Sequence, residues 1–107
     1  MKVFNFDFGK VIIGENSKEN WKIIDSSEDD DIWFHLKDKP SCHMILQYNG
    51  NICQEILNNV AILFKEHSKK CDVKRKLEVI YTYVKFVKKN KSKIGSVNVT
   101  NQRIITV

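Results

Sequence analysis

The sequence has few of the residues that mark special protein classes. Its 107 residues include four glycines and one proline, which excludes a collagen-like chain or a segment rich in proline and glycine. The three cysteines, Cys42, Cys53 and Cys71, are an odd number without Cys-x-x-Cys spacing. This pattern indicates reduced thiols instead of a disulfide framework or a zinc knuckle. We therefore expect a reducing compartment, the cytosol, with the nucleus as the alternative.

Long apolar runs and a secretory signal are also missing. No apolar run approaches about 18 residues, the length that a membrane-spanning helix requires. Lys2 is followed by alternating phenylalanines and polar residues, not by the apolar core of a signal peptide. We expect no membrane partner. With 42% apolar and 29% charged residues the composition is that of a globular protein, and the length fits a single domain over residues 1–107.

Positive charge is concentrated in one stretch of the chain, although the net charge is only +5. Residues 1–64 hold six lysines and ten acidic residues, whereas residues 65–93 hold eleven lysines or arginines and three acidic residues. This asymmetry indicates a polyanionic partner, because lysines neutralise phosphates locally. The alternative is a solvated helix face followed by a lysine-rich loop.

Hydrophobic periodicity predicts a single α+β domain with a mainly antiparallel sheet of short strands. Apolar residues three and four apart predict one long helix over about 51–69, with Asn51 as its N-cap. A short helix is expected over about 17–24, capped by Asn16 or Ser17. Strand patterns occur at 3–8, 10–13, 32–36, 42–48, 77–87, 97–100 and 103–107, and the last two are expected to form a terminal hairpin.

The most particular motif is the run Asp31-Ile32-Trp33-Phe34-His35, which is followed eight residues later by His43. With its surrounding glycines and the closing strands, the motif resembles the NFACT RNA-binding domain. That family occurs in nuclear-export-mediator and ribosome-quality-control factors, in fibronectin-binding-protein-like bacterial relatives and in short coiled-coil-containing proteins. The resemblance implies RNA binding, with tRNA or rRNA as the target in translation or ribosome quality control. DNA is the alternative nucleic acid, and ribosome-associated factors are the protein partners that the resemblance suggests.

The two histidines of the motif fall on the same face of two strands that are expected to pair, so their rings should be close. Imidazoles near Asp31 can bind phosphate when protonated, bind a metal, or form hydrogen bonds to buried backbone. No third ligand is evident, so we expect no metal and no other cofactor. No catalytic Ser/His/Asp order, carboxylate pair or glycine-rich phosphate loop appears either. We therefore expect a protein that is not an enzyme. The minor alternative is a small enzyme that uses His35 and His43.

Aromatic and basic side chains complete the predicted nucleic-acid surface. Trp33 is either a stacking platform for an unpaired base or a tryptophan of the core. Tyr81 and Tyr83 share a strand face with Lys85, an arrangement that suits single-stranded nucleic acid. The expected contact residues are Trp33, His35, His43, Lys69, Lys70, Lys74, Arg75, Lys76, Tyr81, Tyr83, Lys85, Lys88, Lys89, Lys91 and Lys93.

A protein-interaction module is the competing interpretation of the same features. In that case the acidic first half and the Trp33 strand dock another factor, and the lysines only increase solubility.

Overall fold

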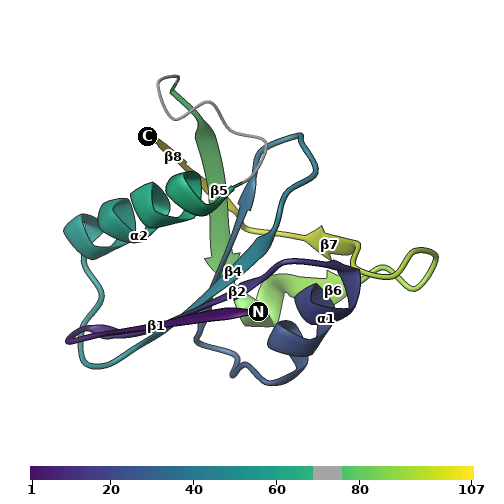
Figure 1. Cartoon of the computed structure of the whole chain (residues 1–107), viewed down its shortest axis with the longest axis horizontal. Helices are drawn as coiled ribbons and strands as arrows, with labels where there is room; N and C mark the ends of the chain where they lie inside the picture. Colours follow the sequence, from purple (N-terminus) through teal and green to yellow (C-terminus); the bar gives the residue numbers. More distant parts are fainter. Residues whose placement is uncertain (69–75) are drawn as a thin grey trace.

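Two antiparallel sheets and two α-helices build the domain in a computed structural model that describes residues 1–68 and 76–107 (Figure 1). This confirms the predicted α+β class, with one short and one long helix. The elements are β1 (Lys2–Phe6), β2 (Gly9–Gly14), α1 (Ser17–Asp25), β3 (Ile32–Leu36), β4 (His43–Tyr48), α2 (Gln54–His67), β5 (Glu78–Tyr83), a 3₁₀ turn η1 (Val84–Phe86), β6 (Val87–Lys89), β7 (Val97–Val99) and β8 (Arg103–Thr106). Neither helix is both long and apolar enough to cross a bilayer within the described ranges.

The main sheet has six strands in the order β1-β2-β4-β3-β5-β8, and every neighbouring pair is antiparallel. Across the centre of this sheet, Trp33 on β3 lies opposite Ile45 on β4. The second sheet is the two-stranded ribbon of β6 and β7. The predicted pairing of 32–36 with 42–48 is therefore confirmed.

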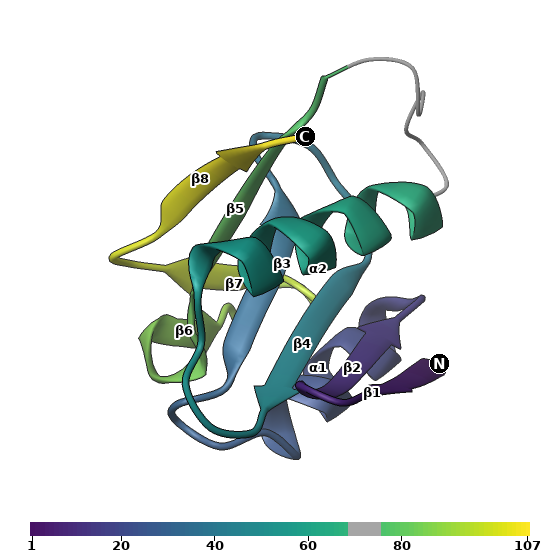
Figure 2. The same ribbon diagram turned by 90° about the vertical axis from the view of Figure 1, so that its left-hand side faces the viewer.

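The two faces of the main sheet are covered by different elements. Helix α2 packs on one face, where Phe34, Met44 and Phe64 belong to the larger apolar cluster (Figure 2). On the other face, Trp33 and Ile45 belong to a smaller cluster covered by α1 and by the β6–β7 ribbon. Because both faces are covered at its centre, β3 buries consecutive side chains and does not alternate between buried and exposed.

The expected terminal hairpin of 97–100 with 103–107 is wrong. Strand β7 pairs with β6, whereas β8 pairs with β5 at the edge of the main sheet. Asn101, with a φ of 56°, takes the left-handed conformation that redirects the chain between the two sheets. The hydroxyl of Thr82 donates to the carbonyl of Thr100 at 3.0 Å and fixes this crossing. Apolar packing decides the partners, because Val99 packs against the smaller cluster and Ile105 belongs to the larger one.

The predicted strand over 77–87 is also interrupted, because the chain leaves the main sheet after Tyr83. Backbone groups of the acidic loop, residues 26–31 between α1 and β3, cause the break. The N–H of Val84 donates to the carbonyl of Asp31 at 2.8 Å, and that of Lys85 donates to the carbonyl of Asp29 at 3.2 Å. These bonds replace the ladder bonds of a continuing strand and start the 3₁₀ turn.

Helix starts follow the prediction at α1 and differ from it at α2. The Asn16 side chain caps α1 by accepting from the N–H of Glu19 at 2.9 Å. Asn51 is not the cap of α2, which begins at Gln54 after Cys53 and has no side-chain cap bond. The reason is that Ile52, partly buried, packs against the core and holds the chain extended before the helix.

Phe64 and Ile62 provide a matched test of the α2 packing. Phe64 is fully buried, whereas 45% of Ile62 is exposed on the same helix. We expect Phe64→Ala to lower the free energy of unfolding by about 3–5 kcal/mol, because it opens a cavity under the helix. Ile62→Ala should change it by about 0.5 kcal/mol or less. Urea denaturation measures both values, and equal losses would contradict the packing described.

Candidate nucleic-acid interface

An open cleft of about 480 Å³ lies on the face of the main sheet opposite α2. Side chains of the central strands, His35, His43 and Ile80, form its floor. The first turn of α1, in contact with the loop 93–96, forms its wall together with β7, and the turn 38–41 forms its lip. The cleft is thus built where β3 ends and β4 and β5 begin.

A tryptophan and two histidines are packed together at the floor of this cleft. The indole N–H of Trp33 donates to Nδ1 of His43 at 3.1 Å. The Trp33 and His35 rings are stacked, with centroids 5.4 Å apart and planes 9° from parallel. The His35 and His43 centroids are 4.9 Å apart, edge to face. The prediction that the two histidines lie close together is confirmed, because continuing the β3–β4 register places them opposite each other.

Trp33 itself does not form a surface platform. Only 1% of its surface is exposed, because His35 stacks over it and α1 residues such as Ile23 pack beside it. The alternative that it is a tryptophan of the core is therefore correct, and the expectation that an RNA base stacks directly on Trp33 is wrong. The aromatic side chain at the cleft surface is the partly exposed His35.

Both histidines are neutral at pH 7. Burial, with a smaller effect from His35, lowers the pKa of His43 to about 3. Burial also lowers the pKa of His35, although its contact with the Leu36 carbonyl acts in the opposite direction. In that contact His35 Nδ1 lies 2.7 Å from the carbonyl oxygen, so Nδ1 carries the proton and donates. The structure therefore argues against phosphate binding by protonated imidazoles.

Asp31 does not join the histidines, although the motif places it near them in sequence. It lies at the opposite end of β3, where its carboxylate accepts from the N–H of Glu28 at 2.9 Å. Asp31 thus orders the acidic loop and not the cleft. The residues that the structure describes contain no group of three or more His, Cys, Asp or Glu side chains that could hold a metal ion.

The predicted basic residues fall into two groups that differ in their contacts. Lys88, Lys91 and Lys93 are exposed on the β6–β7 ribbon and its loop, and Lys93 also lines the cleft. In contrast, the ammonium of Lys85 forms an ion pair with Asp30 of the acidic loop, and that of Lys89 forms one with Asp25 at the end of α1. Lys76 is exposed just before β5. The remaining predicted positions, Lys69, Lys70, Lys74 and Arg75, lie outside the described residues.

Tyr81 and Tyr83 are on the opposite face of the sheet from the histidines. They line a separate hollow of about 300 Å³ together with Arg103 and the start of α2. The ammonium of Lys85 lies 5.2 Å from the Tyr83 ring centroid, so the predicted aromatic and basic pair is formed. The structure does not, however, bring this pair together with His35. One RNA strand cannot contact both sites without passing around the sheet edge.

Lys39 and Asn20 line the cleft but were not among the predicted contacts. Lys39 lines the cleft with Lys93, although it comes from the acidic first half of the sequence. Asn20 is buried in α1, and its side-chain oxygen accepts from the backbone N–H of His43 at 3.3 Å. Gly14 is the residue in the sequence that could have pointed to Asn20, because a Cβ at position 14 would lie 2.5 Å from the Asn20 side-chain oxygen. Position 14 must therefore be glycine for α1 to approach the sheet.

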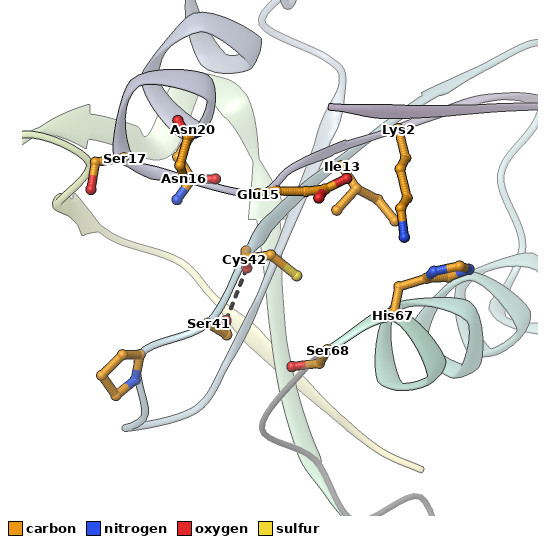
Figure 3. A pocket seen from close by; sticks show the side chains of 11 residues that line it. Lys2, Ile13, Glu15, Asn16, Ser17, Asn20, Ser41, Cys42, His67 and Ser68 are labelled. Carbon is orange, nitrogen blue, oxygen red and sulfur yellow. Dashed lines mark hydrogen bonds between the residues drawn. The ribbon is translucent and has the colours of Figure 1, made fainter.

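A second cavity, of about 290 Å³, adjoins the cleft beyond the strand leading into β4 (Figure 3). It shares Asn20 and Ser41 with the cleft. The end of α2, with His67, forms its other side. Cys42 lies between His67 and Asn20 (Figure 3). The Ser41 hydroxyl accepts from the Leu36 N–H at 3.2 Å and donates to the Cys42 carbonyl at 2.9 Å, which fixes the shared wall.

Comparison with known proteins identifies the family and shows that the fold is similar to that of a solved structure. The family model described as NFACT protein RNA binding domain matches residues 4–101. The structure is similar to that of the C-terminal of the fibronectin/fibrinogen-binding protein from Streptococcus suis, with a TM-score of 0.79 and 24% sequence identity. The match covers 92% of this chain and 40% of the Streptococcus suis chain, so this chain spans less than half of the length of that structure. No curated protein matches the sequence.

The pH dependence of stability tests the neutral state of His43. Because its pKa is lowered from 6.5 to about 3 by folding, the unfolded chain takes up the proton first as the pH falls. We therefore expect stability to be complete above pH 6.5 and to fall by up to about 1.4 kcal/mol per pH unit below it. His43→Asn, which retains a hydrogen-bond acceptor for Trp33, should have a shallower dependence. Urea denaturation between about pH 5 and 7 measures both, and parallel curves would contradict the assignment.

Proposed function

Because the chain belongs to the NFACT RNA-binding domain family, as the match over residues 4–101 shows, we propose that it binds RNA and does not catalyse a reaction on it. That match carries the proposal, since it covers nearly the whole described fold and not one motif alone. Each of the two histidines uses its Nδ1 in a contact within the fold, His43 with the Trp33 indole and His35 with the Leu36 carbonyl, which supports a structural role for these nitrogens.

The RNA-binding face in this proposal is the one that carries the cleft. Lys88, Lys91 and Lys93 project from the β6–β7 ribbon beside it, and Lys39 approaches from the turn on its other side. Lysines on both sides of a groove suit a strand whose phosphates run along its edges. The Tyr81–Tyr83 hollow lies behind the sheet and plays no part in this proposal.

For the target, we propose tRNA or ribosomal RNA in a translation or ribosome-quality-control setting. The family name supports RNA in general, and these RNAs offer the unpaired loops and bulges that protein domains read most readily. Ribosome-associated factors are the protein neighbours expected in the same setting.

Salt dependence tests whether the interaction is with phosphates. We expect the affinity for a fluorescent single-stranded RNA or a tRNA to fall steeply between 50 and 200 mM salt, with a slope of about 0.7 per phosphate contact in a plot of log K against log salt. Fluorescence anisotropy measures this slope. Absence of binding even at low salt would overturn the proposal and leave protein interaction as the function.

Lysine substitutions locate the binding face. We expect Lys88→Gln combined with Lys91→Gln to weaken RNA binding about tenfold and to reduce the salt slope, because two phosphate contacts are lost. The matched control combines Lys10→Gln with Lys65→Gln, which removes the same charge from β2 and α2. Equal losses in both double variants would show that net charge alone, and not this face, determines binding.

A further inference from the structure

The cleft beside the lysines has an uncharged floor. Trp33 and His43 are buried beneath it, and His35 lies partly exposed over Trp33. Among the described residues that line the cleft, the charged ones are Asp38 and Lys39 on the lip and Lys93 on the loop 93–96. A site for phosphate alone would place cations at its floor. An aromatic and neutral floor with lysines at the opening suits a ligand that is flat and uncharged at one end and anionic at the other.

The two imidazoles offer complementary hydrogen-bonding groups. His43 Nδ1 accepts from the Trp33 indole, so in the neutral ring Nε2 carries the proton. His35 donates from Nδ1 to the Leu36 carbonyl, so its Nε2 is left as an acceptor. The floor thus holds one donor and one acceptor on rings whose centroids are 4.9 Å apart. Every nucleobase has a neighbouring donor and acceptor on its edge.

The wall formed by the loop 93–96 is held in place before any ligand binds. The Trp21 indole N–H donates to the Ser96 carbonyl at 3.1 Å. Gly95 has a φ of 89° and lies so near α1 that a Cβ would approach Ser17 Cα to 2.8 Å. These contacts join the loop to α1. The resulting cleft, about 480 Å³, is within the range of small-ligand sites, roughly 300–1,000 Å³.

We propose that this cleft binds one unpaired nucleobase of the RNA, stacked on His35, with its phosphate against Lys39 and Lys93. The inference rests on the proposed function and specifies which part of the RNA enters the domain. A base within a duplex cannot reach the floor, because its edge is paired and both of its faces are stacked. The domain therefore prefers single-stranded or looped RNA to duplex RNA.

Mononucleotides test the cleft without a long RNA. We expect AMP, GMP, CMP or UMP at millimolar concentration to shift the NMR signals of the Trp33 indole N–H and of the His35 ring. Lys93→Gln should weaken this binding, whereas the matched control Lys10→Gln, on β2 and outside the cleft, should not. Both lysines are exposed, so neither substitution should unfold the domain. Absence of shifts with all four nucleotides would overturn the inference.

A stacking variant tests the same site with RNA. We expect His35→Ala to weaken binding of a single-stranded RNA about tenfold and to leave the affinity for a duplex of equal length unchanged. Unchanged amide signals of α2, which packs on the opposite face of the sheet, control for folding in the free variant. If wild type and variant bind single-stranded RNA equally, the nucleobase site is wrong, although the RNA-binding proposal stands. If no RNA binds at all, the RNA-binding proposal fails, and the mononucleotide shifts alone decide whether the cleft is a nucleotide site.

Discussion

The hydrogen bond from the Trp33 indole to His43 Nδ1 is the contact on which this side of the domain depends. Its partners lie on adjacent strands and are 1% and 3% exposed. A buried indole N–H without an acceptor would cost about 1–3 kcal/mol, so His43 must accept and must therefore be neutral. That requirement fixes its tautomer. The stacked His35 then completes a floor that is aromatic, polar and uncharged.

The two faces of the sheet have different roles because they are covered to different extents. Helix α2 closes one face with a continuous apolar core around Phe34 and Phe64. On the other face, α1 and the β6–β7 ribbon cover the centre and leave the end with the histidines open. The face under α2 carries the larger core and stabilises the fold, and the open end of the other face forms the cleft, a concave surface of the kind that ligands occupy.

The charges are distributed differently in the folded domain than along the sequence. The segment 65–93 is strongly basic, yet Lys85 within it pairs with Asp30 of the acidic loop and Lys89 pairs with Asp25 at the end of α1. Conversely, Lys39 from the acidic first half lies at the cleft with Lys93. Folding therefore brings one lysine from each half of the chain to the cleft, which a count by sequence segment cannot show.

Local pattern was sufficient wherever a local interaction decides the structure. Strand alternation predicted that His35 and His43 share a face and are close, and Asn16 was identified as a cap from its spacing to Glu19. The terminal hairpin was wrong because packing of β7 and β8 against different apolar clusters outweighs their closeness in sequence.

The burial of Trp33 was not predictable from its strand alone, since α1 and the β6–β7 ribbon, distant in sequence, cover that face. The lysine partners of the acidic loop escaped prediction for the same reason.

Mapping bound RNA onto the domain by amide chemical-shift perturbation tests the central claim most directly. With a single-stranded RNA, we expect the largest changes at His35, His43, the turn 38–41 and the loop 93–96, which surround the cleft. Changes confined to Tyr81, Tyr83 and Arg103, in the hollow on the α2 face, would contradict the claim and place the RNA on the opposite side of the sheet.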